Sequence, residues 1–279
     1  MDVFVSVDME GVAGVTTARH VTRSTDDYPF ARDLMIEEAN AAVAGAFDGG
    51  ATHVVVSDSH SDMGNLLAGR MDPRAQLVVG TPKLPWSMMT GIRDGFACAL
   101  FVGYHAGAGV EAAVMDHTFT GAFADVRVNG EPWNETHLNA ALAGTFGVPV
   151  GLVTGDDKCC EQAEKRLPGV RTVAVKTAIG RHVASNVSPE LARAKIRLAA
   201  TETVREAANL EAFVPPGPFV FEVDLADTAM TDLASLPPGT ERIGPRTVRF
   251  EDGDFRRAMR AFLTCVWLVR GVSPRPSVL

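Results

Sequence analysis

The sequence predicts an α/β fold, in which a mainly parallel sheet is flanked by helices in Rossmann-like layers and a smaller α+β unit follows. Short β-branched segments alternate with amphipathic helical segments through about the first 155 residues, which is the pattern of βαβ units. After residue 170 the order of strands and helices changes. A chain of 279 residues is long enough for two modest domains, and we expect them to comprise residues 1–170 and 171–279.

Four strands and one long helix account for the pattern in the first domain. The helix is expected over residues 29–47, because Ala39, Val43 and Phe47 recur at helical spacing and Gly49-Gly50 follows as a stop signal. It should pack on the sheet. The strands are expected at residues 3–7, 53–57, 98–103 and 148–154.

The Asn129-Gly130 dipeptide lies between two strand-like segments and favours a two-residue hairpin turn. We therefore expect an antiparallel ribbon here, before a helix that begins near Asn134 and ends near Gly144. A further helix includes residues 161–166. The two acidic residues 156 and 157 precede it, and we expect their side chains to cap this helix rather than to bind a ligand.

The second domain is predicted as an α+β unit. Pro215-Pro216-Gly217-Pro218 forms a rigid turn inside it. The expected order is a strand at 172–176, a long helix at 189–212, a strand at 219–225, a short helix, a strand at 247–251 and a helix at 254–269.

Composition and charge exclude several classes of function. The net charge of −8 and the sequence pI near 5.4 argue against binding to nucleic acid or to an anionic membrane. The longest apolar stretch, residues 96–103, is far shorter than the roughly 20 residues that span a bilayer. Acidic residues at positions 2, 8 and 10 interrupt any secretory signal, and four cysteines without a C-x-x-C pair suggest reduced thiols. We expect a cytoplasmic protein.

Polar residues gather where the predicted parallel strands end. Asp8 and Glu10 follow the first strand, His60 follows the second and His105 the third. The carboxyl ends of parallel strands lie at one edge of a sheet, so these side chains should converge there. Carboxylates and imidazoles without thiolates favour Zn, Mn or Fe over a structural cysteine-rich zinc site. The sequence therefore predicts a metal centre.

Of the remaining histidines, one could take part in catalysis, and the others are expected to be structural or on the surface. His117 follows the His105 loop by twelve residues and could return to the site as a general acid or as a donor to the transition state; a structural role is the alternative. His53 begins its strand and should lie at the opposite edge. His20, His137 and His182 are expected to be structural or on the surface.

Several ordered motifs, with little change in spacing, resemble the DppA-like zinc-dependent D-aminopeptidases of bacterial dipeptide-transport operons. The similarity extends over nearly the whole chain. The motifs are residues 6–11 (SVDMEG), Asn40, residues 57–61 (SDSHS), 103–106 (GYHA), 114–117 (VMDH), 134–140 (NETHLNA) and 154–157 (TGDD).

This resemblance implies a site with two Zn²⁺ ions per subunit. Asp8 would bridge both ions, Glu10 and His60 would complete one, and His105 and Glu135 the other; Glu135 is known only from the resemblance. His117 matches the proposed catalytic histidine of the family. The resemblance also implies a ring-shaped homodecamer whose active sites face an enclosed channel that admits short peptides. The chain departs from the family pattern around residues 13–28 and at His137.

We therefore expect a dinuclear zinc aminopeptidase that removes N-terminal D-amino acids, with D-Ala preferred, from short peptides. The same ligands would also support hydrolysis of L-peptides, amides or phosphate esters by a dinuclear site. A non-catalytic, metal-containing peptide-binding protein is a further alternative.

Overall fold

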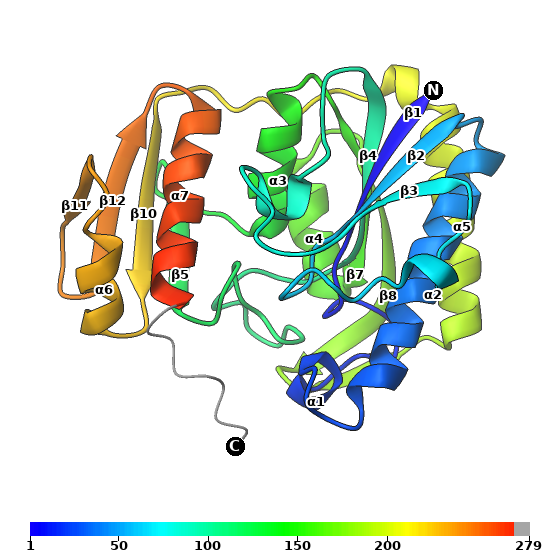
Figure 1. The fold of residues 1–279 in the computed structure, drawn as a ribbon, viewed down its shortest axis with the longest axis horizontal. Coiled ribbons are helices and arrows are strands. Elements are labelled where there is room, and N and C mark those ends of the chain that lie inside the picture. The colour runs from blue at the N-terminus through cyan, green and yellow to red at the C-terminus, as the bar shows by residue number, and fades with distance from the viewer. Residues whose placement is uncertain (271–279) are drawn as a thin grey trace.

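The computed structural model describes residues 1–270, which form two sheets with helices packed between and beside them (Figure 1). The first sheet has the strand order β3-β2-β1-β4-β7-β8-β9, and every neighbouring pair is parallel except β8 and β9. The predicted α/β fold class is confirmed. The strands of this sheet are β1 (Asp2–Val7), β2 (His53–Asp58), β3 (Ala75–Val78), β4 (Phe96–Tyr104), β7 (Val150–Asp156), β8 (Arg171–Gly180) and β9 (Val183–Asn186).

The second sheet is antiparallel and has the order β11-β12-β10-β5-β6. The predicted Asn-Gly hairpin is confirmed, because Asn129 (φ 54°) and Gly130 (φ 80°) form the turn between β5 and β6. Its strands are β5 (Phe123–Val128), β6 (Glu131–Pro132), β10 (Phe219–Leu225), β11 (Thr240–Arg242) and β12 (Thr247–Asp252).

Helices cover both faces of the first sheet and fill the space between the two sheets. In Figure 1, α2 and α5 lie on the outer face of the first sheet, α3 and α4 lie on its other face, and α7 packs between α3 and the second sheet. The helices are α1 (Ala18–Val21), α2 (Tyr28–Asp48), α3 (Glu135–Gly144), α4 (Asp157–Arg166), α5 (Pro189–Arg205), α6 (Thr228–Ala234) and α7 (Phe255–Arg270); short 3-10 turns occupy Ala68–Arg70, Ser87–Met89 and Ala207–Asn209.

Two apolar cores follow from the alternation of side chains along the strands. Val3, Val5 and Val7 of β1 pack with α2 and α5. Phe4, which points to the opposite face, packs in the core that α3, α7 and the second sheet share. The second sheet is therefore joined to the first through a continuous apolar core.

The change of order after residue 170 does not mark the division between the sheets. β8, β9 and α5 belong to the first sheet and its outer layer, whereas β5 and β6, which precede residue 170, belong to the second sheet. Strand pairing is a long-range property, and residues 171–180 carry no local sign of pairing with β7. The helix expected at 189–212 ends at Arg205, and β3, β9 and β11 were not predicted.

Within the described residues 1–270, no helix is both long enough and apolar enough to cross a lipid bilayer. The four cysteines are buried and free, and burial raises the pKa of the Cys160 thiol to about 12. Asp156 caps α4 as expected, because its carboxylate accepts the backbone N–H of Cys159 at 2.7 Å.

Candidate metal centre

The predicted metal ligands meet at the carboxyl edge of the first sheet. The strand order reverses between β1 and β4, which is the switch point where open α/β sheets bind ligands. Asp8 and Glu10 follow β1, His105 follows β4, and His60 follows β2. All four side chains are buried.

Two glycines allow the ends of β1 and β4 to approach closely enough to form this site. Gly11 donates its N–H to the carbonyl of Gly103 at 2.8 Å. A Cβ atom on Gly11 would lie 1.8 Å from the carbonyl oxygen of Tyr104. Gly103 has φ +69°, and a Cβ atom there would lie 2.3 Å from the carbonyl oxygen of Asp8. Larger residues would push the two ligand-bearing loops apart.

Asp8 lies between two histidines. Its Oδ1 atom is 3.3 Å from Nδ1 of His60, and its Oδ2 atom is 3.4 Å from Nε2 of His105. A second carboxylate flanks each histidine: Glu10 Oε2 is 2.9 Å from His60 Nδ1, and Glu135 Oε1 is 3.4 Å from His105 Nε2. The site therefore consists of two carboxylate–imidazole pairs that share Asp8.

Glu135 is the residue that strand ends could not predict, because it comes from a helix. It occupies the first turn of α3, after the N-cap Asn134, whose side chain accepts the N–H of His137. An acid in a first helical turn is usual, so the sequence position alone is uninformative. Its burial within an entirely buried helix is unusual.

Backbone carbonyls fix the orientation of three imidazole rings. His60 donates from Nε2 to the carbonyl of Val21 at 3.1 Å, His105 from Nδ1 to Ala106 at 2.9 Å, and His117 from Nδ1 to Met115 at 2.8 Å. In His60 and His105 the other ring nitrogen faces the carboxylates. Metal-binding histidines are typically oriented by such a bond at the non-ligating nitrogen.

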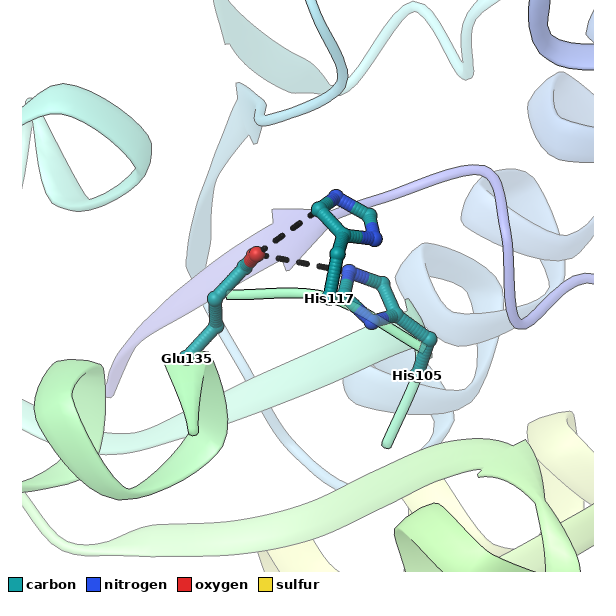
Figure 2. Close-up of side chains that lie close together, drawn as sticks. All are labelled: His105, His117 and Glu135. Carbon is teal, nitrogen blue, oxygen red and sulfur yellow. Dashed lines mark ion pairs between the residues drawn. The ribbon is translucent and has the colours of Figure 1, made fainter. Parts of the chain in front are cut away.

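His117 packs directly on the candidate ligands. Its ring stacks on His105 with centroids 4.0 Å apart, and its Nε2 atom lies 3.8 Å from Glu135 Oε1. Figure 2 shows both imidazoles beside the Glu135 carboxylate. The His117 side chain is 22% exposed, whereas His105 is nearly inaccessible. His117 can thus contact both the candidate ligands and a molecule bound in the cavity.

The donor set fits divalent metal ions. Oxygen or nitrogen atoms of Asp8, Glu10 and His105 lie within 4.8 Å of one another, and so do those of His105, His117 and Glu135. The Nε2 atom of His105 is buried without a hydrogen-bond partner. Buried polar atoms are normally paired, and an ion between these groups would satisfy this nitrogen. Carboxylate and imidazole together suit zinc.

The electrostatics of the site also favour a cation. Burial, followed by the nearby carboxylate of Glu10, raises the pKa of Asp8. Burial by itself disfavours protonated His60 and His105, but Glu10, Glu135 and Asp8 outweigh it and raise both imidazole pKa values well above the ordinary range. A cluster of buried carboxylates binds positive charge, whether as protons or as metal ions.

The loop after β1 is held by a buried lysine from β8. The ammonium of Lys176 donates to the carbonyls of Glu10 at 2.6 Å and Val12 at 2.8 Å, and to that of Val15. Burial lowers the pKa of Lys176 to about 8. Glu38 accepts the N–H of Ala13 in the same loop at 2.9 Å. These bonds set the backbone position of Glu10.

The loop that carries His60 is organised by Asp58. Its carboxylate accepts the N–H of Leu66 at 2.8 Å and the side-chain amide of Asn65 at 2.9 Å, so it closes the loop instead of facing the metal site. Lys83 donates to the carbonyl of Asp58 and to the hydroxyl of Ser57. Burial lowers the pKa of Lys83 to about 8.

Strained backbone accumulates in the loops that carry His60 and His117. Five non-glycine residues there have positive φ, a conformation that is rare for residues with a Cβ atom and that tends to cluster at functional sites. They are Ser61, Met63, Ala112, Met115 and Phe119.

The other four histidines are not among the groups of candidate metal ligands in the described residues. His137 is buried in α3 and donates from Nε2 to the carbonyl of Gln162, and burial lowers its pKa to about 4. His20 Nδ1 accepts the N–H of Thr16. His53 lies at the start of β2, 3.5 Å from Asp2, and His182 is exposed.

A cavity of about 580 Å³ opens over the metal centre. A volume of this size suits a small molecule or a short peptide. Asp8, Glu10, His60, His117 and Glu135 line its floor. The rest of its lining includes Arg23, Asp62, Met63, Ser87, Met88, Phe119, Thr120, Trp267 and Arg270.

Known proteins resemble the chain over its whole length. The family profile described as D-aminopeptidase matches residues 1–264. A D-aminopeptidase of Bacillus subtilis (strain 168) is 36% identical over 274 residues, which cover 98% of this chain and 99% of that protein. A solved structure, the Zn-dependent D-aminopeptidase DppA from Bacillus subtilis, described as a self-compartmentalizing protease, superposes with a TM-score of 0.89 at 37% identity and 100% coverage of both chains.

Proposed function

The chain belongs to the D-aminopeptidase family, and on this basis we propose that it is a zinc-dependent aminopeptidase that removes N-terminal D-amino acids, with D-Ala preferred, from short peptides. The Zn dependence of the similar solved protein supports the choice of metal. The observation that carries the proposal is the position of Asp8, whose two oxygens face two separate histidines.

Two Zn²⁺ ions per subunit fit this arrangement. Asp8 would bridge them, with Glu10 and His60 completing one coordination sphere and His105 and Glu135 the other. Two zinc ions, when bound, supply an activated water at neutral pH and polarise the scissile carbonyl. The protein contributes rigidity, because His60 and His105 are fixed by backbone carbonyls.

His117 is the candidate for proton transfer. Its Nδ1–H is committed to the carbonyl of Met115, so Nε2 is the nitrogen that faces the site. From this position Nε2 would accept a proton from the attacking water and deliver it to the leaving amine. Positioned acid–base groups of this kind typically contribute about 100- to 10,000-fold in rate.

The cavity also supports a short peptide as the substrate. Its volume of about 580 Å³ suits a short peptide. The free amine of the substrate would bind one of the zinc ions, which would place the N-terminal residue at the metal centre.

The deciding experiment compares the release of D-Ala and L-Ala from otherwise identical peptides. Chelator-treated protein would be assayed with and without added zinc. We expect cleavage of the D-peptide only, and only with zinc. Cleavage of the L-peptide alone would assign the site to L-peptides instead. If neither peptide were cut while the protein bound about two zinc ions per chain, the metal centre would stand and the substrate would be wrong.

We further propose a ring-shaped homodecamer in the cytoplasm, with active sites facing an enclosed channel. The self-compartmentalizing description of the solved relative supports assembly, and exposed apolar side chains on β8, β9 and α5 provide surface for contacts between copies. These are Ile179, Val183, Leu191 and Leu198. Sedimentation should give ten times the 29.7 kDa mass of one chain. The four free, buried cysteines suit a reducing compartment.

A further inference from the structure

Two arginines line the cavity over the metal centre, and they differ in their partners. Arg23 donates to Asp62 Oδ1 at 2.8 Å and to the carbonyl of Gly64 at 3.0 Å, so its guanidinium is already paired. Arg270, at the end of α7, has no carboxylate within 4.0 Å and no hydrogen-bond partner among residues 1–270. The residue is partly buried.

The position of Arg270 is defined by an aromatic neighbour. The guanidinium carbon lies 5.0 Å from the ring centroid of Trp267, one helical turn earlier, and Trp267 also lines the cavity. Stacking on an aromatic ring restricts a long arginine side chain and leaves its N–H groups free to bind an anion. Glu135 is near enough to favour the charge of Arg270 but makes no ion pair with it. Burial of a guanidinium without a directly bonded anion is unfavourable, so this position favours a negatively charged ligand.

The cavity therefore offers two different groups to a ligand. The candidate metal ligands Asp8, Glu10 and Glu135 line it, and so does Arg270, which has no carboxylate within 4.0 Å among the described residues. A short peptide has a matching group at each end, because a bound metal ion would receive its amine and an arginine would bind its carboxylate. An extended residue spans at most about 3.6 Å, so the two ends of a dipeptide lie close enough for one small cavity to hold both.

We propose that Arg270 binds the C-terminal carboxylate of the peptide substrate and so selects short peptides with a free C-terminus. This inference rests on the proposed function. The arginine fork matches the two oxygens of a carboxylate, and the pair would orient the peptide with its amino end towards the metal centre. Arg270 is here a binding and specificity residue and takes no part in proton transfer.

The test compares D-Ala-Gly with its C-terminal amide, which removes the negative charge and keeps the shape. We expect wild-type kcat/KM to favour the free acid by about 10- to 100-fold, the range of a hydrogen-bonded ion pair. Arg270→Gln should bring the acid-to-amide ratio close to one. Arg270→Lys, which keeps the charge but loses the fork, should retain part of the preference.

Arg23→Gln is the matched control, because Arg23 lines the same cavity but is paired with Asp62. Its acid-to-amide ratio should stay as in the wild type. Loss of the ratio in Arg23→Gln, but not in Arg270→Gln, would overturn the assignment. An equal loss on both peptides in Arg270→Gln would also overturn it, because that result indicates a structural role.

A third peptide, D-Ala-Glu-amide, separates a terminal carboxylate from one on a side chain. If Arg270→Gln lowered kcat/KM for this peptide alone, Arg270 would bind an acidic side chain of the substrate, and the proposal would be overturned. A wild-type enzyme that cuts the acid and the amide equally well would refute the role of Arg270 while leaving the proposed function intact. If the wild type cuts neither peptide, the proposed function itself fails.

Discussion

Asp8 joins the two halves of the proposed metal centre, because each of its oxygens faces a different histidine. The neighbouring histidines differ in burial and in hydrogen bonding. His60 and His105 are buried and fixed by backbone carbonyls, whereas His117 is partly exposed to the cavity. These differences in burial and bonding separate the residues that should hold metal from the one that should move protons.

Substitution of single histidines should reveal this division. His105→Ala should lose zinc and activity together, because Nε2 of His105 lies between Asp8 and Glu135. His117→Ala should keep its zinc and lose about 100- to 10,000-fold in kcat. Zinc content per chain and kcat, measured on the same preparations, check both expectations. Loss of zinc in His117→Ala would make this histidine a ligand instead.

Lys176→Met should loosen the loop that carries Glu10. Three buried backbone carbonyls would lose their donor, and each buried acceptor left unpaired is unfavourable by about 1–3 kcal/mol. We expect lower stability by about 3 kcal/mol or more and weaker zinc binding. Urea unfolding and competition with a zinc chelator measure the two effects.

Lys195→Met, at an exposed position of α5, is the control for this experiment. It should change neither quantity appreciably. Unaltered stability and zinc affinity in Lys176→Met would show that the loop is held without the ammonium.

At the scale of elements, the site depends on how α2, β8 and the loop after β1 meet. Glu38 reaches from α2 to the N–H of Ala13, and Lys176 reaches from β8 to the carbonyls of the same loop. Glu38 is 2% exposed, and one of its carboxylate oxygens has no hydrogen-bond partner among the described residues. A buried carboxylate in this position should make the junction sensitive to pH.

Stability should fall as the pH rises through the range in which Glu38 ionises. Burial raises the pKa of Glu38 from 4.5 to about 7. Between these two values the folded state holds a proton that the unfolded state has released, so the free energy of unfolding decreases as the pH rises and then levels off above about 7. Glu38→Gln cannot ionise. The free energy of unfolding of Glu38→Gln, minus that of the wild type, should therefore increase by about 3 kcal/mol from pH 4.5 to pH 8.

Urea unfolding of both proteins at pH 4.5 and pH 8 measures this difference. Glu37→Gln, in the same helix but with a 43% exposed side chain that pairs with Arg193, is the matched control. A stability difference between wild type and Glu38→Gln that does not vary with pH would contradict the expectation.

At the scale of the whole molecule, the proposed metal centre combines residues from several layers. Its candidate ligands come from the edge of the first sheet and from α3. Helix α7, which lies beside the second sheet (Figure 1), contributes Trp267 and Arg270 to the lining of the cavity. Bound metal would therefore link elements that are distant in sequence, and its removal should lower the free energy of unfolding of the whole chain.

Removal of zinc should lower the melting temperature. Without metal, only protons on the neighbouring imidazoles offset the buried charges of Asp8, Glu10 and Glu135, whereas bound zinc would also join loops that are distant in sequence. Zinc at 100 times its dissociation constant adds about 2.7 kcal/mol, and for a chain of this size we expect a gain of about 5–10 °C. Calorimetry of chelated and zinc-restored protein tests this. His105→Ala should lack most of the gain; a similar gain in this variant would place the zinc elsewhere.

The sequence by itself determined the local features of this protein. Neighbouring residues are enough to predict the alternation of β-branched strands with an amphipathic helix and the Asn129-Gly130 turn. The structure has these features nearly where they are expected. The positions of Asp8, Glu10, His60 and His105 after parallel strands were also enough to predict that they would converge, because such strands end at a common edge.

Only the tertiary structure decided how distant segments pair and which buried groups meet. It placed β8, β9 and α5 with the first sheet, brought Glu135 from α3 to His105, and directed Lys176 to the loop after β1. It also brought Arg270 to the cavity wall. Strand pairing and the burial of charge depend on contacts between residues far apart in the chain, and no local pattern of residues encodes them.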